Sequence, residues 1–112
     1  MKTSLQTNHH SFVEELRRRV LEGPGETPPA ARQEAAKTAA GVSTVQDRYS
    51  DLARQIGDAA YRVTDAEVAS VLSVAGSEKA AFEIIAAAAL GAGLLRWQQA
   101  IKTLEEVGDA TK

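Results

Sequence analysis

The sequence predicts an all-α protein, a five-helix orthogonal bundle organised around a long buried C-terminal helix. Apolar residues recur at three- and four-residue steps along most of the chain, and no stretch of strand length alternates with period two. The 112 residues include 21 Ala, a strong helix former whose small side chain lets helix axes approach closely. A chain of this length forms one domain, which we place at residues 11–112 after a mobile arm at residues 1–10.

The first predicted helix covers residues 12–22. Ser11 and Glu14 have the spacing of a capping box, and the apolar pattern ends before Gly23. In the run from Arg17 to Arg19, the last two arginines have glutamates at four-residue spacing, so we interpret the run as an ion-paired face exposed to solvent. The alternative is a site for a partner or an anion.

The next two helices are predicted at residues 28–40 and 44–61. The first of them starts with Thr27 as its cap and prolines in its first turn, offers mainly Ala for packing, and ends at Gly41. The other starts with Ser43 as its cap and has a regular apolar face over about five turns.

The last two helices are predicted at residues 65–75 and 78–107. Thr64 and Glu67 form a capping box at the start of the first, and Gly76 breaks the chain between the two. The first half of the final helix is apolar on nearly every face, so it must be covered all round, either by this chain or by another copy of it.

Two apolar faces run along the final helix. One holds Phe82, Ile85, Ala86, Ala89, Gly93, Ala100 and Leu104, and the other holds Ala81, Ile84, Ala88, Ala92 and Leu95. Gly91 and Gly93 each cost roughly 1 kcal/mol relative to Ala inside a helix, which indicates that another backbone passes close to them. Self-association through this surface is compatible with the pattern.

Glu83 is the charged residue that stands out in the apolar part of this helix. A buried carboxylate must be paired or protonated, and an apolar setting can also tune it as a general base. Arg96 lies roughly 20 Å further along the same helix and cannot reach it. We therefore expect Arg62 as a partner for Glu83 and Asp65 or Glu67 as a partner for Arg96, or the corresponding residues of a second subunit.

These residues define the candidate site. Glu83 and Arg96 are the candidate catalytic residues, and Arg62 and Trp97 join them as candidate ligand-binding residues. Two interpretations stay open: structural ion pairs, or a polar pocket that binds a small molecule.

Composition excludes several classes of function. The formal net charge is −2 with mixed signs, which gives no case for nucleic acid. The chain has no Cys, and its two histidines, His9 and His10, lie in the predicted arm, so no thiolate site, catalytic triad or metal site is expected and no cofactor is predicted. The longest uncharged apolar run, from Ile84 to Leu95, is shorter than the ~20 residues of a membrane span. We therefore expect no membrane association and a cytoplasmic location.

A family resemblance covers Val63 to Ala100. It is carried by the segments V-T-D-A-E-V, A-G-S-E ahead of F-E-I-I-A-A-A, and G-A-G-L-L-R. Together they resemble the C-terminal helical pair of the carboxymuconolactone decarboxylase / alkylhydroperoxidase D-like superfamily, in which an Arg near the position of Arg96 follows such a helix in many members. The resemblance implies an alkylhydroperoxidase D-like all-α fold that assembles into rings, with active sites near subunit contacts.

The resemblance argues against the best-known activity of that superfamily. Its peroxidase members rely on a Cys-x-x-Cys pair with a nearby His and Glu, and this chain has no Cys and no His after His10. The decarboxylase members use His, Arg and Glu. In this chain only Glu83 and Arg96 are candidates for such roles, and no His is available.

The sequence thus predicts a non-redox, oligomeric helical protein that acts as a binding or interaction module, with further copies of itself and a protein partner as its expected contacts. The alternative is a cofactor-independent lyase or isomerase in which Glu83 accepts a proton and Arg96 holds a small anionic substrate. Whether the protein is an enzyme is left open, although cysteine-dependent peroxidase activity is excluded.

Overall fold

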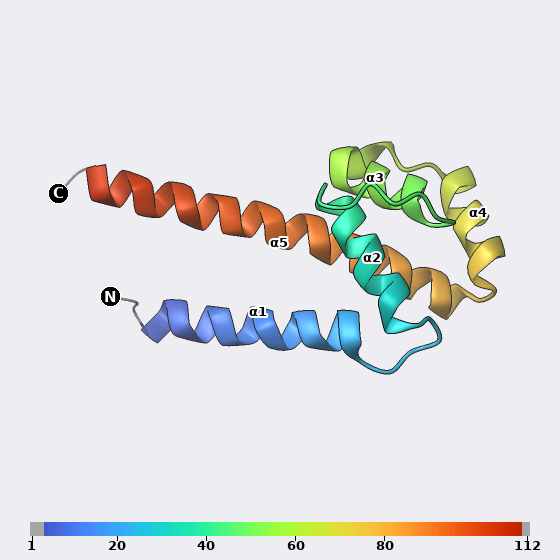
Figure 1. Cartoon of the computed structure of the whole chain (residues 1–112), viewed down its shortest axis with the longest axis horizontal. Coiled ribbons are helices and arrows are strands. Elements are labelled where there is room, and N and C mark those ends of the chain that lie inside the picture. Colours follow the sequence, from blue (N-terminus) through green and yellow to red (C-terminus); the bar gives the residue numbers. More distant parts are fainter. Residues whose placement is uncertain (1–3, 111–112) are drawn as a thin grey trace.

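The computed structural model describes residues 4–110, which form five α-helices and one short 3-10 turn (Figure 1). In chain order they are α1 (Ser4–Glu22), α2 (Pro29–Ala39), α3 (Ser50–Ala59), η1 (Ala60–Arg62), α4 (Asp65–Ala75) and α5 (Glu78–Ala110). No strand occurs between residues 4 and 110. The predicted all-α fold class is confirmed.

The helices form a body from which two of them project. In Figure 1, α2, α3 and α4 surround the first half of α5, while α1 and the second half of α5 extend to one side and run antiparallel. The molecule measures 54 × 28 × 22 Å, and its radius of gyration is 15.9 Å, against about 13 Å for a compact domain of this length. The elongation comes from the projecting helices.

The core lies between α2, α3 and one face of α5. On α5, Ile84, Ala87 and Ala88 are almost completely buried, and they pack against small residues of α2 and the apolar face of α3. This confirms the predicted packing of the face that contains Ala81, Ile84, Ala88 and Ala92. On the other predicted face, Ile85 packs against the core and Ala86 is half-buried. Its remaining members, Phe82, Ala89, Gly93, Ala100 and Leu104, are exposed within a single chain, so this chain supplies only part of the cover that the sequence calls for.

Two glycines let α2 lie close to its neighbours. A Cβ atom on Gly57 of α3 would overlap the carbonyl oxygen of Ala39, and one on Gly91 of α5 would overlap that of Ala36. The expected close backbone is therefore found at Gly91. At Gly93 the same expectation is wrong for the described residues of one chain: beyond the glycine's own stretch of helix, none of them lies within 4 Å of a Cβ placed on Gly93.

The best-predicted element is α4. It spans residues 65–75 as expected, the capping box between Thr64 and Glu67 is present, and Gly76 follows in the left-handed conformation with φ 92°. Ser77 then accepts a hydrogen bond from the backbone N–H of Ala80 at 3.0 Å and caps α5.

The first helix starts earlier than predicted. It begins at Ser4, so the predicted arm at residues 1–10 is corrected for residues 4–10, which are helical; residues 1–3 lie outside the described part of the chain. Ser11 is therefore an interior residue of α1 and caps nothing.

The third helix starts later than predicted, at Ser50. The Ser43 hydroxyl donates to the Glu34 carboxylate and accepts from the backbone N–H of Val45, which holds the chain in a loop. The carboxylate of Asp47 then accepts from the backbone N–H of Tyr49 at 2.9 Å, which forms a turn ahead of the helix.

Candidate functional site

The carboxylate of Glu83 anchors the segment that joins α1 to α2. Its Oε1 accepts from the backbone N–H of Thr27 at 2.8 Å and from the Thr27 hydroxyl at 2.6 Å, and its Oε2 accepts from the backbone N–H of Glu26 at 2.9 Å. A Cβ on Gly25 would lie 2.6 Å from Oε2, so a larger residue at this position would require the Glu83 carboxylate to shift from its present place. Thr27 was expected to cap α2, but its hydroxyl is used on Glu83 and α2 has no side-chain cap.

These contacts keep Glu83 ionised. Burial raises the pKa of Glu83, but the hydrogen bonds from the Thr27 hydroxyl and from the backbone N–H groups of Glu26 and Thr27, with the positive charge of Arg32, outweigh it and lower the pKa to about 2. A carboxylate with so low a pKa and with three donors already bound is a poor proton acceptor near neutral pH. The expected partner, Arg62, is not among its contacts.

Arg32 is a buried cation that the sequence analysis missed. Only 3% of it is exposed, and its guanidinium donates to the carbonyl oxygens of Val20 at 2.7 Å, Gly23 at 2.5 Å and Thr27 at 3.4 Å. Its Nε has no hydrogen-bond partner. The signal in the sequence was an arginine inside an otherwise Ala-rich helix, next to a linker whose carbonyl groups need donors.

The other candidate residues have separate partners. Arg96 Nη2 donates to the carbonyl oxygen of Gly57 at 2.6 Å and so links α5 to α3, rather than to Asp65 or Glu67 as expected. The guanidinium of Arg62 lies over the ring of Tyr61, with its Cζ atom 5.7 Å from the ring centroid.

Trp97, the fourth candidate, is 44% exposed and lies beyond the core on α5. Glu83, Arg62 and Arg96 are therefore used at three different places, and their contacts do not form the polar pocket that was considered.

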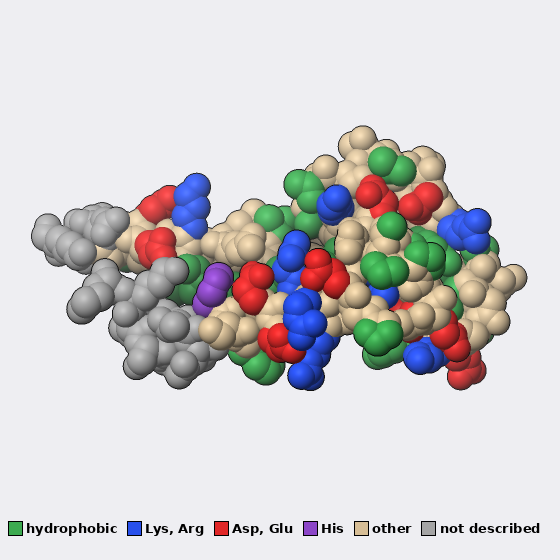
Figure 2. Space-filling model, turned by 60° about the horizontal axis from the view of Figure 1, so that its bottom comes forward, with side chains coloured by type: hydrophobic (Ala, Val, Ile, Leu, Met, Phe, Trp, Pro, Cys, Tyr) green, Lys and Arg blue, Asp and Glu red, His purple; other side chains and the backbone are tan. Residues whose placement is uncertain are grey.

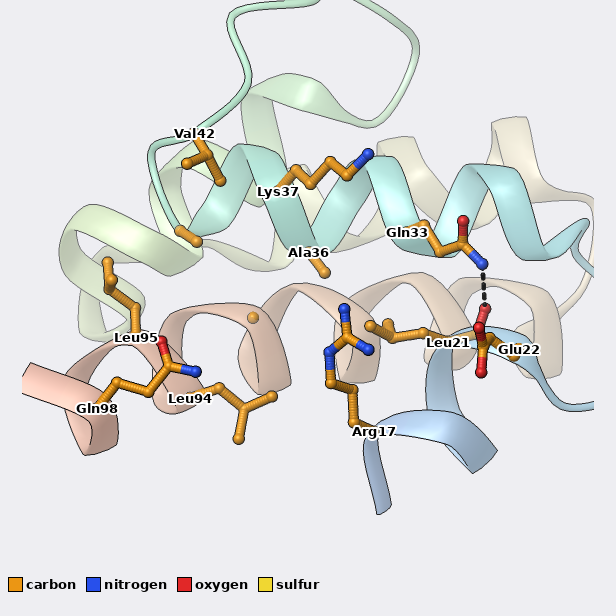
Figure 3. Close-up of a pocket in the computed structure, with 12 residues that line it drawn as sticks. Arg17, Leu21, Glu22, Gln33, Ala36, Lys37, Val42, Leu94, Leu95 and Gln98 are labelled. Carbon is orange, nitrogen blue, oxygen red and sulfur yellow. Dashed lines mark hydrogen bonds between the residues drawn. The ribbon is translucent and has the colours of Figure 1, made fainter. Parts of the chain in front are cut away.

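A cavity opens instead where α1, α2 and α5 meet (Figure 3). It has a volume of about 410 Å³. Among its lining residues are Arg17 and Leu21 from α1, Gln33 and Lys37 from α2, and Leu94 and Gln98 from α5. Gln33 Nε2 donates to the backbone carbonyl of Leu21 at 3.3 Å, which ties α2 to α1 at the edge of the cavity.

Charges of both signs are mixed on the face that carries α1 (Figure 2). Glu15 binds Arg18 at 2.6 Å and Arg19 at 2.9 Å, which confirms the predicted ion-paired face for these two arginines. Arg17 is different, because it lines the cavity.

An exposed apolar stripe follows α5 on the face away from the core. It consists of Phe82, Ala89, Gly93, Ala100 and Leu104, all exposed, and we call it the α5 stripe. Phe82 is 68% and Leu104 is 66% exposed, and Phe12 on α1 is 70% exposed. At 100° per residue, the five members of the stripe fall within about 60° of one another round the helix.

No group of three His, Asp or Glu side chains between residues 4 and 110 is placed to hold a metal ion. The part of α5 from Glu78 to Gly108 is long and apolar enough to cross a membrane by length and composition, although a third of its most apolar window is buried in this structure. Core helices of soluble proteins have the same length and composition.

No family model matches this chain, and no curated protein or solved structure is significantly similar to it.

Proposed function

We propose that this protein is a small helical interaction module that assembles with copies of itself through the α5 stripe. The observation that carries the proposal is the exposure of this stripe along a helix whose other face forms the core. Large contiguous apolar surfaces on soluble proteins are typical of interaction sites.

The total surface supports an interface of ordinary size. The accessible surface is 7632 Å² for a mass of 11.9 kDa, whereas a compact monomer of that mass exposes about 6,000 Å². The five end residues outside the described range would account for about 800 Å² of this excess even if fully extended. About 800 Å² is left, and a stable pair of proteins buries about 800 Å² on each partner.

Gly93 gives a second, local argument. A glycine inside a helix costs roughly 1 kcal/mol relative to Ala, and at Gly91 the close approach of Ala36 explains why glycine is needed. At Gly93 no atom of residues 4–110 beyond its own stretch of helix comes within 4 Å of a Cβ, so no close approach within the described part of the chain explains the glycine. With Ala89 four residues earlier, Gly93 forms a shallow surface on which the helix of a second copy can pack closely.

The proposal includes the non-redox, alkylhydroperoxidase D-like identity suggested by the sequence, without a cofactor and in the cytoplasm. The lyase or isomerase alternative receives less support, because Glu83 is a bound, low-pKa carboxylate and Arg96 donates to a backbone carbonyl. Neither group is available for the role that this alternative gives it.

The test is the mass in solution. We expect light scattering and sedimentation to give at least twice 11.9 kDa at micromolar concentration. Gly93→Leu places a bulky side chain in the stripe and is expected to weaken self-association at least a hundredfold, while circular dichroism stays helical.

The matched control is Gln99→Leu, which adds the same side chain to an exposed position of the same helix, about 110° from the stripe. It should assemble like the wild type. The proposal would be contradicted by a wild-type protein that stays monomeric at a concentration 100-fold above the micromolar range. A Gly93→Leu variant that still assembles would contradict it as well.

A further inference from the structure

We propose that the cavity between α1, α2 and α5 binds a small amphipathic carboxylate, a molecule with an apolar body and one carboxylate head. This site is distinct from the α5 stripe and does not depend on self-association. It rests on three features of the cavity: its apolar wall, its uneven charge, and the position of one arginine.

The wall of the cavity suits an apolar body. Leu21 of α1, Ala36 of α2 and Leu94 of α5 line the cavity (Figure 3). Gly91 lines it too, at a point where a Cβ atom would overlap the carbonyl oxygen of Ala36. The volume of about 410 Å³ lies within the range of small-molecule sites, roughly 300–1,000 Å³. These sites are mostly apolar, with a few polar groups that orient the ligand.

The charge of the lining favours an anion. Arg17 and Lys37 are its cations and Glu22 is its acid, so the net charge of the lining is positive. Arg18 and Arg19 are paired with Glu15, whereas Arg17 makes no ion pair or hydrogen bond to any residue in the described range.

The direction of Arg17 identifies the kind of head group. Figure 3 shows its guanidinium pointing from α1 into the cavity, with Leu21 on one side and Leu94 on the other; Gln98, which also lines the cavity, lies beyond Leu94. A guanidinium binds a carboxylate through two parallel hydrogen bonds, and an amide N–H can donate a third. A lining with a net charge of one suits a carboxylate better than a doubly charged phosphate.

Octanoate is the probe that tests this site, with 1-octanol and acetate as its uncharged and tail-less counterparts. We expect octanoate to bind with a submillimolar Kd in a ¹⁵N NMR titration, with shifts centred on the three helix segments round the cavity. Octanol and acetate should each bind at least tenfold more weakly, because one lacks the charge and the other the apolar body.

Two matched pairs of variants locate the head group. Arg17→Gln should weaken octanoate at least tenfold, whereas Arg18→Gln, on the neighbouring exposed position, should not. Gln98→Glu places a negative charge in the cavity and should weaken octanoate similarly, whereas Gln99→Glu places the same charge outside it.

The results that would overturn the site are equally specific. The site is wrong if octanoate does not bind at millimolar concentration, or if 1-octanol binds as tightly as octanoate. It is also wrong if the NMR shifts lie on the α5 stripe, or if Arg17→Gln and Arg18→Gln weaken octanoate binding equally. The masses of the same samples, measured by light scattering, separate a failure of this site from a failure of self-association.

Discussion

The Glu83 carboxylate connects α5 to a linker more than fifty residues earlier in the chain. Each of its oxygens accepts from a backbone N–H group of that linker, and one also accepts from a hydroxyl. Thr27, which supplies two of these donors, is buried, and a donor cut off from water that loses its acceptor costs more free energy than an ordinary hydrogen bond contributes. The stability of the fold therefore depends on the ionised form of this residue.

We predict that Glu83→Gln lowers the free energy of unfolding by about 1–3 kcal/mol at pH 7, because the amide cannot accept all three hydrogen bonds. The pKa of Glu83 is lowered from 4.5 to about 2, so its contribution is present above pH 4.5 and is lost as the pH falls towards 2. Urea unfolding at several pH values measures this.

The difference between wild type and Glu83→Gln should shrink steadily from pH 4.5 to pH 2. Glu106→Gln, at an exposed position of the same helix, is the control and should change little. A difference that stays constant across this pH range would show that the carboxylate has another role.

The sequence identified Glu83 as unusual but did not identify its partners. A single charged residue in an apolar helix can be recognised in the sequence. Its backbone N–H partners cannot, because nearly every residue has a backbone N–H group. The same limit applies to Arg96, whose partner is the carbonyl of Gly57, and to Arg32, which binds three carbonyls. Side-chain pairs at helical spacing, such as Glu15 with Arg19, were predictable because they are local.

At the level of helices, α2 is the central packing element. Its C-terminal half lies against α3 and α5, and a glycine on each of these helices makes room for its backbone. The apolar side chains of α2 are Ala and Pro only, and their small size permits this close approach. The linker after Gly41, with φ 79°, then leads away to the loop before α3.

We predict that Gly57→Ala destabilises the protein by about 1–3 kcal/mol, although Ala is normally the better helix residue. The added methyl group would overlap the carbonyl of Ala39 and push α2 away from α3. Thermal unfolding measures the effect, with Asp58→Ala at the next, exposed position as the control. A higher melting temperature for Gly57→Ala would contradict the close approach.

Helix boundaries were predictable where local capping decides them. Thr64, Glu67 and Gly76 set both ends of α4, and all three contacts are local. The loop before α3 was missed because Ser43 has the spacing of a cap but binds Glu34, which belongs to another helix. The extra turns of α1 were missed because they have no apolar pattern.

For the whole molecule, elongation and the exposed stripe lead to the same expectation. A protein that self-associates in its folded state is stabilised by its own concentration, because the assembly binds only folded chains. The sequence indicated that α5 needs cover on all sides, and the structure shows which side lacks it. How many copies provide that cover is a property of the assembly.

We predict that the melting temperature rises by several degrees between 1 and 100 µM protein. Differential scanning fluorimetry or calorimetry over this range measures it. The Gly93→Leu variant should melt at one temperature throughout, and a wild type that does the same would count against self-association.

The Glu83 anchor also bears on how the chain folds. Its hydrogen bonds join residues 56 and 57 positions apart, so they form only after the intervening chain has been brought together, which has an entropic cost. The capped turn at Gly76 and the local helices can form long before. We therefore expect the hydrogen bonds of Glu83 to form after the transition state of folding. They should slow unfolding and have little influence on the folding rate.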